Sequence, residues 1–286
     1  MFHDMINHKV LVSGADFFAL DAPINPYYDD NPVEISKAVS EHAEIVLAFQ
    51  SAGIEIIKVQ PPSTSQDGVY TANWALVRGK KAVLARLPSA RQSEEDYAER
   101  ELKNLGFEVV HVPSDWHFSG QGDALPCGKF LLAGSGYRSD PHAQQFAAET
   151  LGYELVQLHA VPKLANDGQP FINPSSGWAD SFFYDIDLAI SVLREDLIAY
   201  CPEAFDAESR IKIESLPLEK IRVSYDEATK GFACNLVSTG ETVIMSSHAP
   251  KLKAEIESHG LKTITPGISE LSRGGGYIRC VSLSLN

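Results

Sequence analysis

Asp140-Pro-His-Ala-Gln-Gln-Phe-Ala-Ala-Glu-Thr-Leu-Gly152 is followed at once by Tyr153-Glu-Leu-Val-Gln-Leu158, and this stretch carries the pattern that decides the fold. Proline at the first helical position, after a polar residue, is typical of a helix start. Glycine suits the left-handed residue that follows a helix, and the apolar run after it suits a strand. The stretch therefore predicts a helix that ends at Gly152 and leads into a strand.

The same helix–glycine–strand pattern recurs along the chain. Its other copies are Asn31-Pro32 to Phe49 with Gly53 and strand 54–59, Glu94 to Leu105 with Gly106 and strand 107–112, and Ala249-Pro250 to His259 with Gly260 and strand 261–265. The four glycines are separated by 53, 46 and 108 residues, and 108 is twice 54. A degenerate copy is therefore expected near residue 206, where 202–205 and 206–211 look helical.

Five units of about 55 residues thus fill the chain. Further strands are expected beside the helices, at 81–86, 129–133 and 241–245. Units of this length that cannot bury their own apolar face stack on their neighbours, so the period predicts a ring or a solenoid. We expect one α/β domain over residues 1–286. The alternative is an ordinary α/β protein, in which the same pattern is common.

Composition restricts the classes of function. The 286 residues are 44% hydrophobic and carry a formal net charge of −14, so a packed core is expected and a nucleic-acid partner is not. No apolar run is long enough for a membrane span, and Met1 to His8 lacks the features of a signal peptide. Four cysteines occur without a CxxC pair, which favours reduced thiols, no metal site and a cytoplasmic protein.

The end of the chain carries the strongest local signal. Glu270-Leu-Ser-Arg-Gly-Gly-Gly-Tyr-Ile-Arg-Cys280 places three glycines before an apolar segment with one cysteine. Glycines let the backbone approach a ligand and expose N–H donors, and a thiolate beside such donors is a candidate nucleophile. The alternative is a flexible turn with a structural cysteine.

Two further regions look like loops of a binding site, because small residues alternate with polar ones. They are Gln66 to Trp74, which contains Asp67-Gly-Val-Tyr-Thr-Ala-Asn73, and Trp116 to Leu125, which contains Phe118-Ser-Gly-Gln-Gly-Asp123 and is followed by Gly134-Ser-Gly-Tyr-Arg138. Three short segments are also distinctive: Ile24-Asn25-Pro26, Tyr184-Asp-Ile-Asp187 and Pro202-Glu-Ala-Phe205. Together with Glu270 to Cys280 they resemble, in the same order, the motifs of the guanidine-modifying (pentein) superfamily. The resemblance is greatest to the branch of dimethylarginine dimethylaminohydrolases and arginine dihydrolases. It covers essentially the whole chain and implies a five-bladed α/β propeller, in agreement with the five units.

The resemblance also implies a mechanism and a set of site residues. A cysteine attacks the planar carbon of a guanidinium or ureido group, an amine leaves, and water releases the covalent intermediate. Carboxylates hold the guanidinium, and arginines hold the carboxylate of an amino-acid-like substrate. Cys280 matches the nucleophile; the matched positions for substrate binding are Asn25, Asp67, Asn73, Arg91, Asp123, Arg138, Asp187 and Gly275. We expect no cofactor and no metal, and a homo-oligomer is possible.

Two departures from the family pattern concern catalysis. Asp185 stands where the family has its catalytic histidine, and Ser119 stands where it has a glutamate. An anion near Cys280 raises the pKa of its thiol, and the lost histidine removes a group that titrates near neutrality. The candidate proton carriers are Asp185 and, as a second choice, His117. His117 would face the same side of a strand as Ser119, unless it is simply solvated.

Three readings follow for the function. The first is a cysteine hydrolase that cleaves a C–N bond of an arginine-like guanidino or ureido compound, with Cys280, Asp185 and Ser119 as its catalytic set. The second is a catalytically impaired pentein that binds a small carboxylate through Arg91 and Arg138. The third is an amidinotransferase, in which an amine replaces water as the acceptor.

Overall fold

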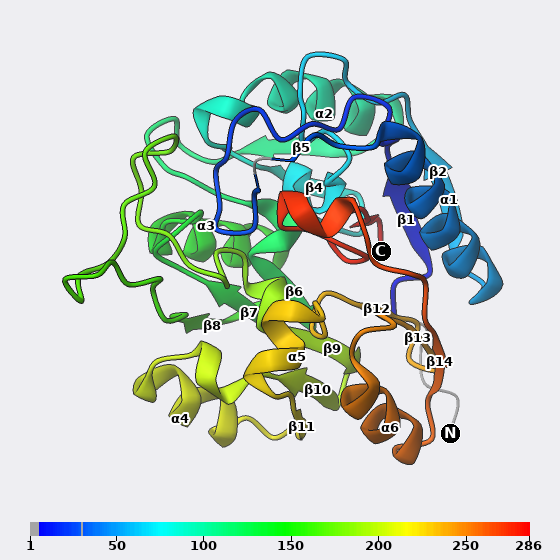
Figure 1. Ribbon diagram of the computed structural model, residues 1–286, viewed down its shortest axis with the longest axis vertical. Coiled ribbons are helices and arrows are strands. Elements are labelled where there is room, and N and C mark those ends of the chain that lie inside the picture. Colours follow the sequence, from blue (N-terminus) through cyan, green and yellow to red (C-terminus); the bar gives the residue numbers. More distant parts are fainter. Residues whose placement is uncertain (1–5, 30) are drawn as a thin grey trace.

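A computed structural model describes residues 6–29 and 31–286. The segment Met1 to Met5, part of the stretch in which we expect no signal peptide, lies outside the described residues, as does Asp30. Within these described ranges, the strands form five three-stranded sheets (Figure 1). In the described part of the chain no helix is both long and apolar enough to cross a membrane.

All five sheets share one plan, in which an inner strand pairs antiparallel with a middle strand and the middle strand pairs parallel with an outer one. The sheets, from inner to outer strand, are β15 (Leu283–Ser284), β1 (Lys9–Val12), β2 (Glu55–Lys58); β3 (Ala75–Arg78), β4 (Lys81–Leu84), β5 (Glu108–His111); β6 (Ala124–Cys127), β7 (Phe130–Gly134), β8 (Glu154–Leu158); β9 (Ile190–Arg194), β10 (Leu197–Tyr200), β11 (Glu219–Arg222); and β12 (Val237–Ser238), β13 (Thr242–Ile244), β14 (Lys262–Ile264).

A helix joins the two parallel strands of each sheet, as a parallel connection requires. These helices are α1 (Ile35–Ser51), α2 (Ser93–Asn104), α3 (Pro141–Leu151), α4 (Ala207–Ser215) and α6 (Pro250–Ser258), and they lie around the outside of the molecule in Figure 1. A short sixth helix, α5 (Tyr225–Lys230), precedes β12 and was not expected. The α/β class and the helix–strand units predicted from the sequence are confirmed.

Local sequence accounts for helix ends such as that of α3, but one predicted helix start is wrong because a distant residue binds there. Gly152 closes α3 with φ of 72°, the left-handed conformation expected of it. The prediction that α1 begins at Pro32 is wrong, because the helix begins at Ile35 after Glu34. The carbonyl groups of Asn31 and Pro32 accept hydrogen bonds from Arg273 instead of starting the helix. The degenerate unit near residue 206 is α4, capped by Asp206, which accepts from the backbone N–H of Ser209.

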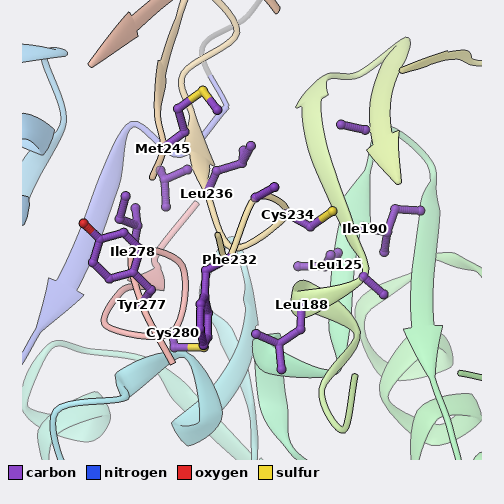
Figure 2. Packing of buried hydrophobic residues seen from close by; sticks show 14 of the residues in the cluster. Leu125, Leu188, Ile190, Phe232, Cys234, Leu236, Met245, Tyr277, Ile278 and Cys280 are labelled. Carbon is purple, nitrogen blue, oxygen red and sulfur yellow. The ribbon is translucent and has the colours of Figure 1, made fainter. Parts of the chain in front are cut away.

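The two ends of the chain build one sheet together. Strand β1 near the N-terminus pairs with β15 at the C-terminus, so Val10 lies opposite Ser284. The inner strands of neighbouring sheets lie side by side: β15 with β3, β6 with β9, and β9 with β12. A large apolar cluster fills the space around them, and Figure 2 shows part of it, including Phe232 and Cys280.

Candidate functional site

Cys280 lies in a buried turn just before β15, with 2% of its surface exposed. One side chain, Asn235, organises this turn. Its Oδ1 atom accepts hydrogen bonds from the backbone N–H groups of Tyr277 (3.1 Å), Arg279 (3.0 Å) and Cys280 (3.3 Å), and its Nδ2 atom donates to Cys280 Sγ at 3.1 Å. The amide thus holds both the backbone of the turn and the sulfur atom.

A carboxylate lies on the other side of the sulfur. Cys280 Sγ donates to Asp187 Oδ2 at 3.3 Å. Burial, followed by the charges of Asp187 and Asp185, raises the pKa of the Cys280 thiol well above its ordinary value. Burial and the charge of Asp185 likewise raise the pKa of Asp187. Burial and the neighbouring carboxyl groups therefore favour the protonated form of the thiol.

Asp185 and Ser119, the two residues that differ from the expected pattern, both accept hydrogen bonds from Asn73. Asn73 Nδ2 donates to Asp185 Oδ2 at 2.7 Å and to Ser119 Oγ at 2.9 Å. The other oxygen of Asp185 has no partner among the described residues. Burial raises the pKa of Asp185, while the nearby charge of Arg138 opposes that rise. Asp185 therefore has one oxygen available to a ligand and a tendency to hold a proton.

Arg91 is buried and already paired. Its Nε and Nη2 atoms donate to the two oxygens of Glu94 at 2.8 and 2.7 Å, and its Nη1 atom donates to Asn73 Oδ1 at 2.8 Å. Asp67 lies beside it and accepts from Tyr28 Oη at 2.9 Å. Burial raises the pKa of Asp67 to about 6, although Arg91 works against the rise. Arg91 thus orients Asn73 and is neutralised by Glu94.

Arg138, unlike Arg91, forms no ion pair with a described residue. Its Nη2 atom donates to the carbonyl of Ile24, and its Nη1 atom is buried without a partner among the described residues. The guanidinium lies 5.0 Å from the centre of the Tyr184 ring and 6.0 Å from that of Trp178. Aromatic faces stabilise a guanidinium without using its N–H donors. Arg138 therefore keeps a donor for an anionic group.

The structure brings most of the sequence-predicted residues to one cavity, which we call the front cavity. The predicted residues that line it are Asn25, Asp67, Asn73, Arg91, Ser119, Arg138, Asp185 and Cys280. Its volume is about 20 Å³. That volume suits about one water molecule rather than an amino acid, so the described conformation is closed.

Three predicted residues do not line the front cavity. Asp123 accepts from the backbone N–H of Ile186 at 3.1 Å, and Asp187 accepts from Cys280 Sγ at 3.3 Å. Gly275 has φ of 90°, and a Cβ atom there would fall 2.6 Å from the amide of Asn25. Their substrate contacts stay predictions, whereas their observed contacts brace the site.

Sequence reasoning missed Asn235, Glu94 and Trp178. Glu94 follows Arg91 by three residues, a spacing that brings side chains together on a helix and could have revealed the pair. No motif signals Asn235 or Trp178. His117 packs against Trp178, with ring centres 4.3 Å apart, and approaches Asp140 at 3.6 Å, so it lies outside the front cavity lining. Within the described residues, no group of three or more His, Cys, Asp or Glu side chains is arranged to hold a metal ion.

The sequence matches the model of a known protein family. A model described as N,N dimethylarginine dimethylhydrolase, eukaryotic, matches residues 21–285. The chain belongs to this family. The predicted membership of the dimethylarginine dimethylaminohydrolase and arginine dihydrolase branch is thereby confirmed.

Members of the family and their close relatives include named hydrolases. The dimethylarginine dimethylaminohydrolase of Mycobacterium tuberculosis is 30% identical over 275 residues, which are 94% of this chain and 83% of that protein. The bifunctional arginine dihydrolase/ornithine cyclodeaminase ArgZ of Synechocystis is 30% identical over 281 residues, which are 96% of this chain. The chain spans only 37% of the length of ArgZ.

Solved structures of family relatives have the same fold. The N-terminal domain of ArgZ, covalently bound to a reaction intermediate, superposes with a TM-score of 0.86 at 29% identity and with 97% of each chain covered. A mutant of the Pseudomonas aeruginosa dimethylarginine dimethylaminohydrolase complexed with citrulline superposes with a TM-score of 0.76 over 99% of each chain. At 16% identity, the second comparison shows the fold alone.

Proposed function

We propose that the protein is a hydrolase that cleaves a C–N bond of an arginine-like guanidino or ureido compound through a covalent intermediate on Cys280. One observation carries the proposal. The thiol of Cys280, the unpartnered donor of Arg138 and the unpartnered oxygen of Asp185 belong to one buried cavity. The thiol suits attack on a planar carbon bonded to nitrogen. The donor of Arg138 suits a substrate carboxylate, and the oxygen of Asp185 suits the cationic end of the substrate. The covalent ArgZ structure supports the nucleophile.

Each polar group has a proposed role in binding. Arg138 Nη1 donates to the carboxylate of the substrate, while Asp185 and Asp67 lie near its cationic end. Asn25 shapes the opposite wall, since its Nδ2 atom donates to Gly274 O at 2.9 Å. Arg91 acts on the substrate through Asn73 in the closed state. We propose that the segment with Asn25 and Tyr28 moves to admit substrate, because the closed cavity is too small.

The substrate's charge is part of the proposed chemistry. A bound cation offsets the charge of Asp187, which lowers the pKa of the Cys280 thiol. The thiol proton passes to Asp187 Oδ2 as sulfur bonds to the guanidinium carbon. Asp185 gives a proton to the leaving amine as the C–N bond breaks, as a histidine would over a less acidic range. Water then adds to the carbon and gives a proton back to Asp185. The C–S bond breaks, the proton on Asp187 returns to the sulfur of Cys280, and the second proton of the water leaves with the released amine.

The five sheets support a finer proposal for the fold. Their common strand order, the lateral contacts between inner strands and the pairing of β1 with β15 are what a ring closed by both chain ends requires. We therefore interpret them as five blades of an α/β propeller. A cytoplasmic location and assembly into a homo-oligomer remain predictions.

Product release tests the function. The protein is incubated with arginine, citrulline, methylated arginines and agmatine while ammonia and amine are measured, with Cys280→Ser as the inactive control. Release that requires Cys280, together with a trapped adduct on Cys280 by mass spectrometry, supports the hydrolase. A product that forms only when a second amine is supplied identifies an amidinotransferase.

A second function is favoured by the state of the thiol. The pKa of Cys280 is raised, and no histidine is among the residues that line the front cavity. Both features suit a protein that binds a small carboxylate through Arg138 but does not convert it. Saturable binding of arginine or citrulline by wild type and Cys280→Ser alike, with no release of ammonia or amine, identifies this binding protein.

A further inference from the structure

A second cavity, which we call the rear cavity, lies among the inner strands β3, β6, β9 and β15 and has a volume of about 290 Å³. It shares no lining residue with the front cavity. Arg279 lines the rear cavity while its neighbour Cys280 lines the front one, and Asp187 lines the rear while Asp185 lines the front. The segments 185–187 and 279–280 therefore form a thin wall between the two cavities.

The rear cavity has a polar inner end and an exposed mouth. Gln121, Asp187, Ser191 and Arg279 line it and are buried, whereas Arg78 and Glu195 line it and are exposed. Apolar side chains complete the walls, and Leu125, Ile190 and Cys234 among them are drawn in Figure 2. A small molecule that enters from the mouth would thus meet the guanidinium of Arg279 at the inner end.

Arg279 is a buried cation whose hydrogen-bond partners among the described residues are neutral, while the charge of Asp187 acts on it from a greater distance. Its Nη1 atom donates to Ser282 O at 2.8 Å and its Nη2 atom to Gln121 Oε1 at 2.9 Å. It forms no ion pair with a carboxylate of the described residues, whereas Arg91, which is equally buried at 6% exposed, pairs with Glu94. Burying an unpaired charge is costly, so such a group favours an anionic ligand. Its remaining N–H donors have the planar arrangement that suits a carboxylate.

We propose that the rear cavity binds a small monocarboxylate on Arg279, and that this ligand lowers the reactivity of Cys280. Gln121 and Ser191 supply neutral hydrogen bonds at the same end of the cavity. Nearby Asp187 disfavours ligands of higher negative charge, such as phosphate dianions. The bound anion neutralises the cation adjacent to Asp187 and Cys280, and a thiolate is less stable when a neighbouring cation is neutralised. The proposal concerns binding and thiol reactivity, so it holds whether or not the protein is a hydrolase.

Trifluoroacetate is a suitable probe, since its binding can be followed by ¹⁹F NMR at constant ionic strength. Val192→Phe fills the rear cavity from β9, and Arg279→Met removes the cation. Val110→Phe is the matched control, because Val110 is also a half-buried strand valine but lines neither cavity. Arg138→Gln removes the free donor of the front cavity. The three cavity and control variants are therefore combined with Arg138→Gln. We expect saturable binding to wild type, to Arg138→Gln and to Arg138→Gln with Val110→Phe, and none to Arg138→Gln combined with Val192→Phe or with Arg279→Met.

The second measurement follows alkylation of Cys280 by iodoacetamide, read by peptide mass spectrometry. Saturating trifluoroacetate should slow it about tenfold in Arg138→Gln, the change that one pKa unit produces, and should have no effect when Val192→Phe is added to Arg138→Gln. Binding that survives in Val192→Phe but is lost in Arg138→Gln would place the anion in the front cavity and overturn the proposal. Absence of saturable binding to wild type would overturn it as well, and binding without slower alkylation would overturn the coupling. If Arg279→Met does not fold, Val192→Phe still decides.

Discussion

Asn235 Nδ2 donates to Cys280 Sγ at 3.1 Å, while Asn235 Oδ1 collects three backbone N–H groups of the same turn. These residues are 45 positions apart in the chain. The contact opposes the effect of Asp187 and Asp185 on the thiol, since a donor to sulfur stabilises the thiolate and the two carboxyl groups destabilise it. Because Asn235 contacts the sulfur that we propose as the nucleophile, we propose that it also supports catalysis.

Replacement of Asn235 should make Cys280 less reactive. A hydrogen bond to a charged group contributes about 1.5–3 kcal/mol, so Asn235→Ala should raise the apparent pKa of Cys280 by about 1–2 units. Asn235→Asp keeps an acceptor for the turn but adds an anion beside the sulfur, and should raise the pKa further. The pH dependence of iodoacetamide labelling at Cys280 measures both effects.

Asn173 provides the matched control for Asn235. It is also buried, and its Oδ1 atom likewise accepts two backbone N–H groups of a turn, but the group to which it donates is Asp180. Asn173→Ala should leave the labelling profile of Cys280 unchanged. Equal shifts for the alanine variants at 173 and 235 would mean that general loosening of the fold, rather than the contact with sulfur, controls the thiol.

The two buried arginines should behave differently when they are replaced. Arg138→Gln should weaken substrate binding, with a higher KM and an almost unchanged melting temperature, because Arg138 forms no ion pair with a described residue. Arg91→Gln leaves Glu94 buried without its partner and should cost about 3–5 kcal/mol of unfolding free energy. Urea unfolding and substrate kinetics on both variants check this. A KM effect without destabilisation in Arg91→Gln would return Arg91 to direct substrate contact.

Motifs predicted much of the site because they place chemically distinctive residues on short, recognisable segments. Cys280, Asn73, Arg138 and Asp185 stand in such segments, and the structure brings them to one cavity. Asn235 stands in no motif and reaches Cys280 only through the tertiary fold. Arg91 pairs with Glu94, so its Nε donor is not free for a ligand. The presence of an arginine at position 91 does not by itself reveal this pairing.

The fold was predictable as far as local signals extend. Helix ends at glycine and the spacing of the units follow from backbone preferences within about 20 residues. The pairing of β1 with β15 does not, because it joins residues from opposite ends of the chain. The predicted start of α1 was wrong for a similar reason. Arg273, which is far along the sequence, donates to the carbonyl groups that would have begun the helix.

The buried carboxyl of Asp67 should make stability depend on pH. Burial raises its pKa from 3.8 to about 6, so its contribution is fully present below pH 3.8 and is lost as the pH rises through about 6. Asp67→Asn removes that loss and should increase the unfolding free energy at pH 8 by up to about 3 kcal/mol, with little change below pH 4. Urea unfolding at both pH values measures the difference. Asp206→Asn is the control of opposite sign, because the pKa of Asp206 is lowered.

The exchange at positions 119 and 185 carries the last prediction. One oxygen of Asp185 has no partner among the described residues, and burial favours its protonated form, whereas the hydroxyl of Ser119 accepts from Asn73 and hydrogen-bonds to Asp185. If Asp185 protonates the leaving amine, Asp185→Asn should reduce kcat by about 10²–10⁴, the usual contribution of a general acid, while KM changes less. Asp180 is also a buried carboxyl but does not line the front cavity, so Asp180→Asn should retain activity.

The double variant Asp185→His with Ser119→Glu restores the family pattern and should create or increase arginine hydrolysis near neutral pH, because histidine titrates there. Full activity of Asp185→Asn would exclude Asp185 as the proton donor and leave His117, which would then have to move into the cavity. Failure of both forms to release ammonia or amine from any guanidino or ureido compound would leave the carboxylate-binding protein as the function.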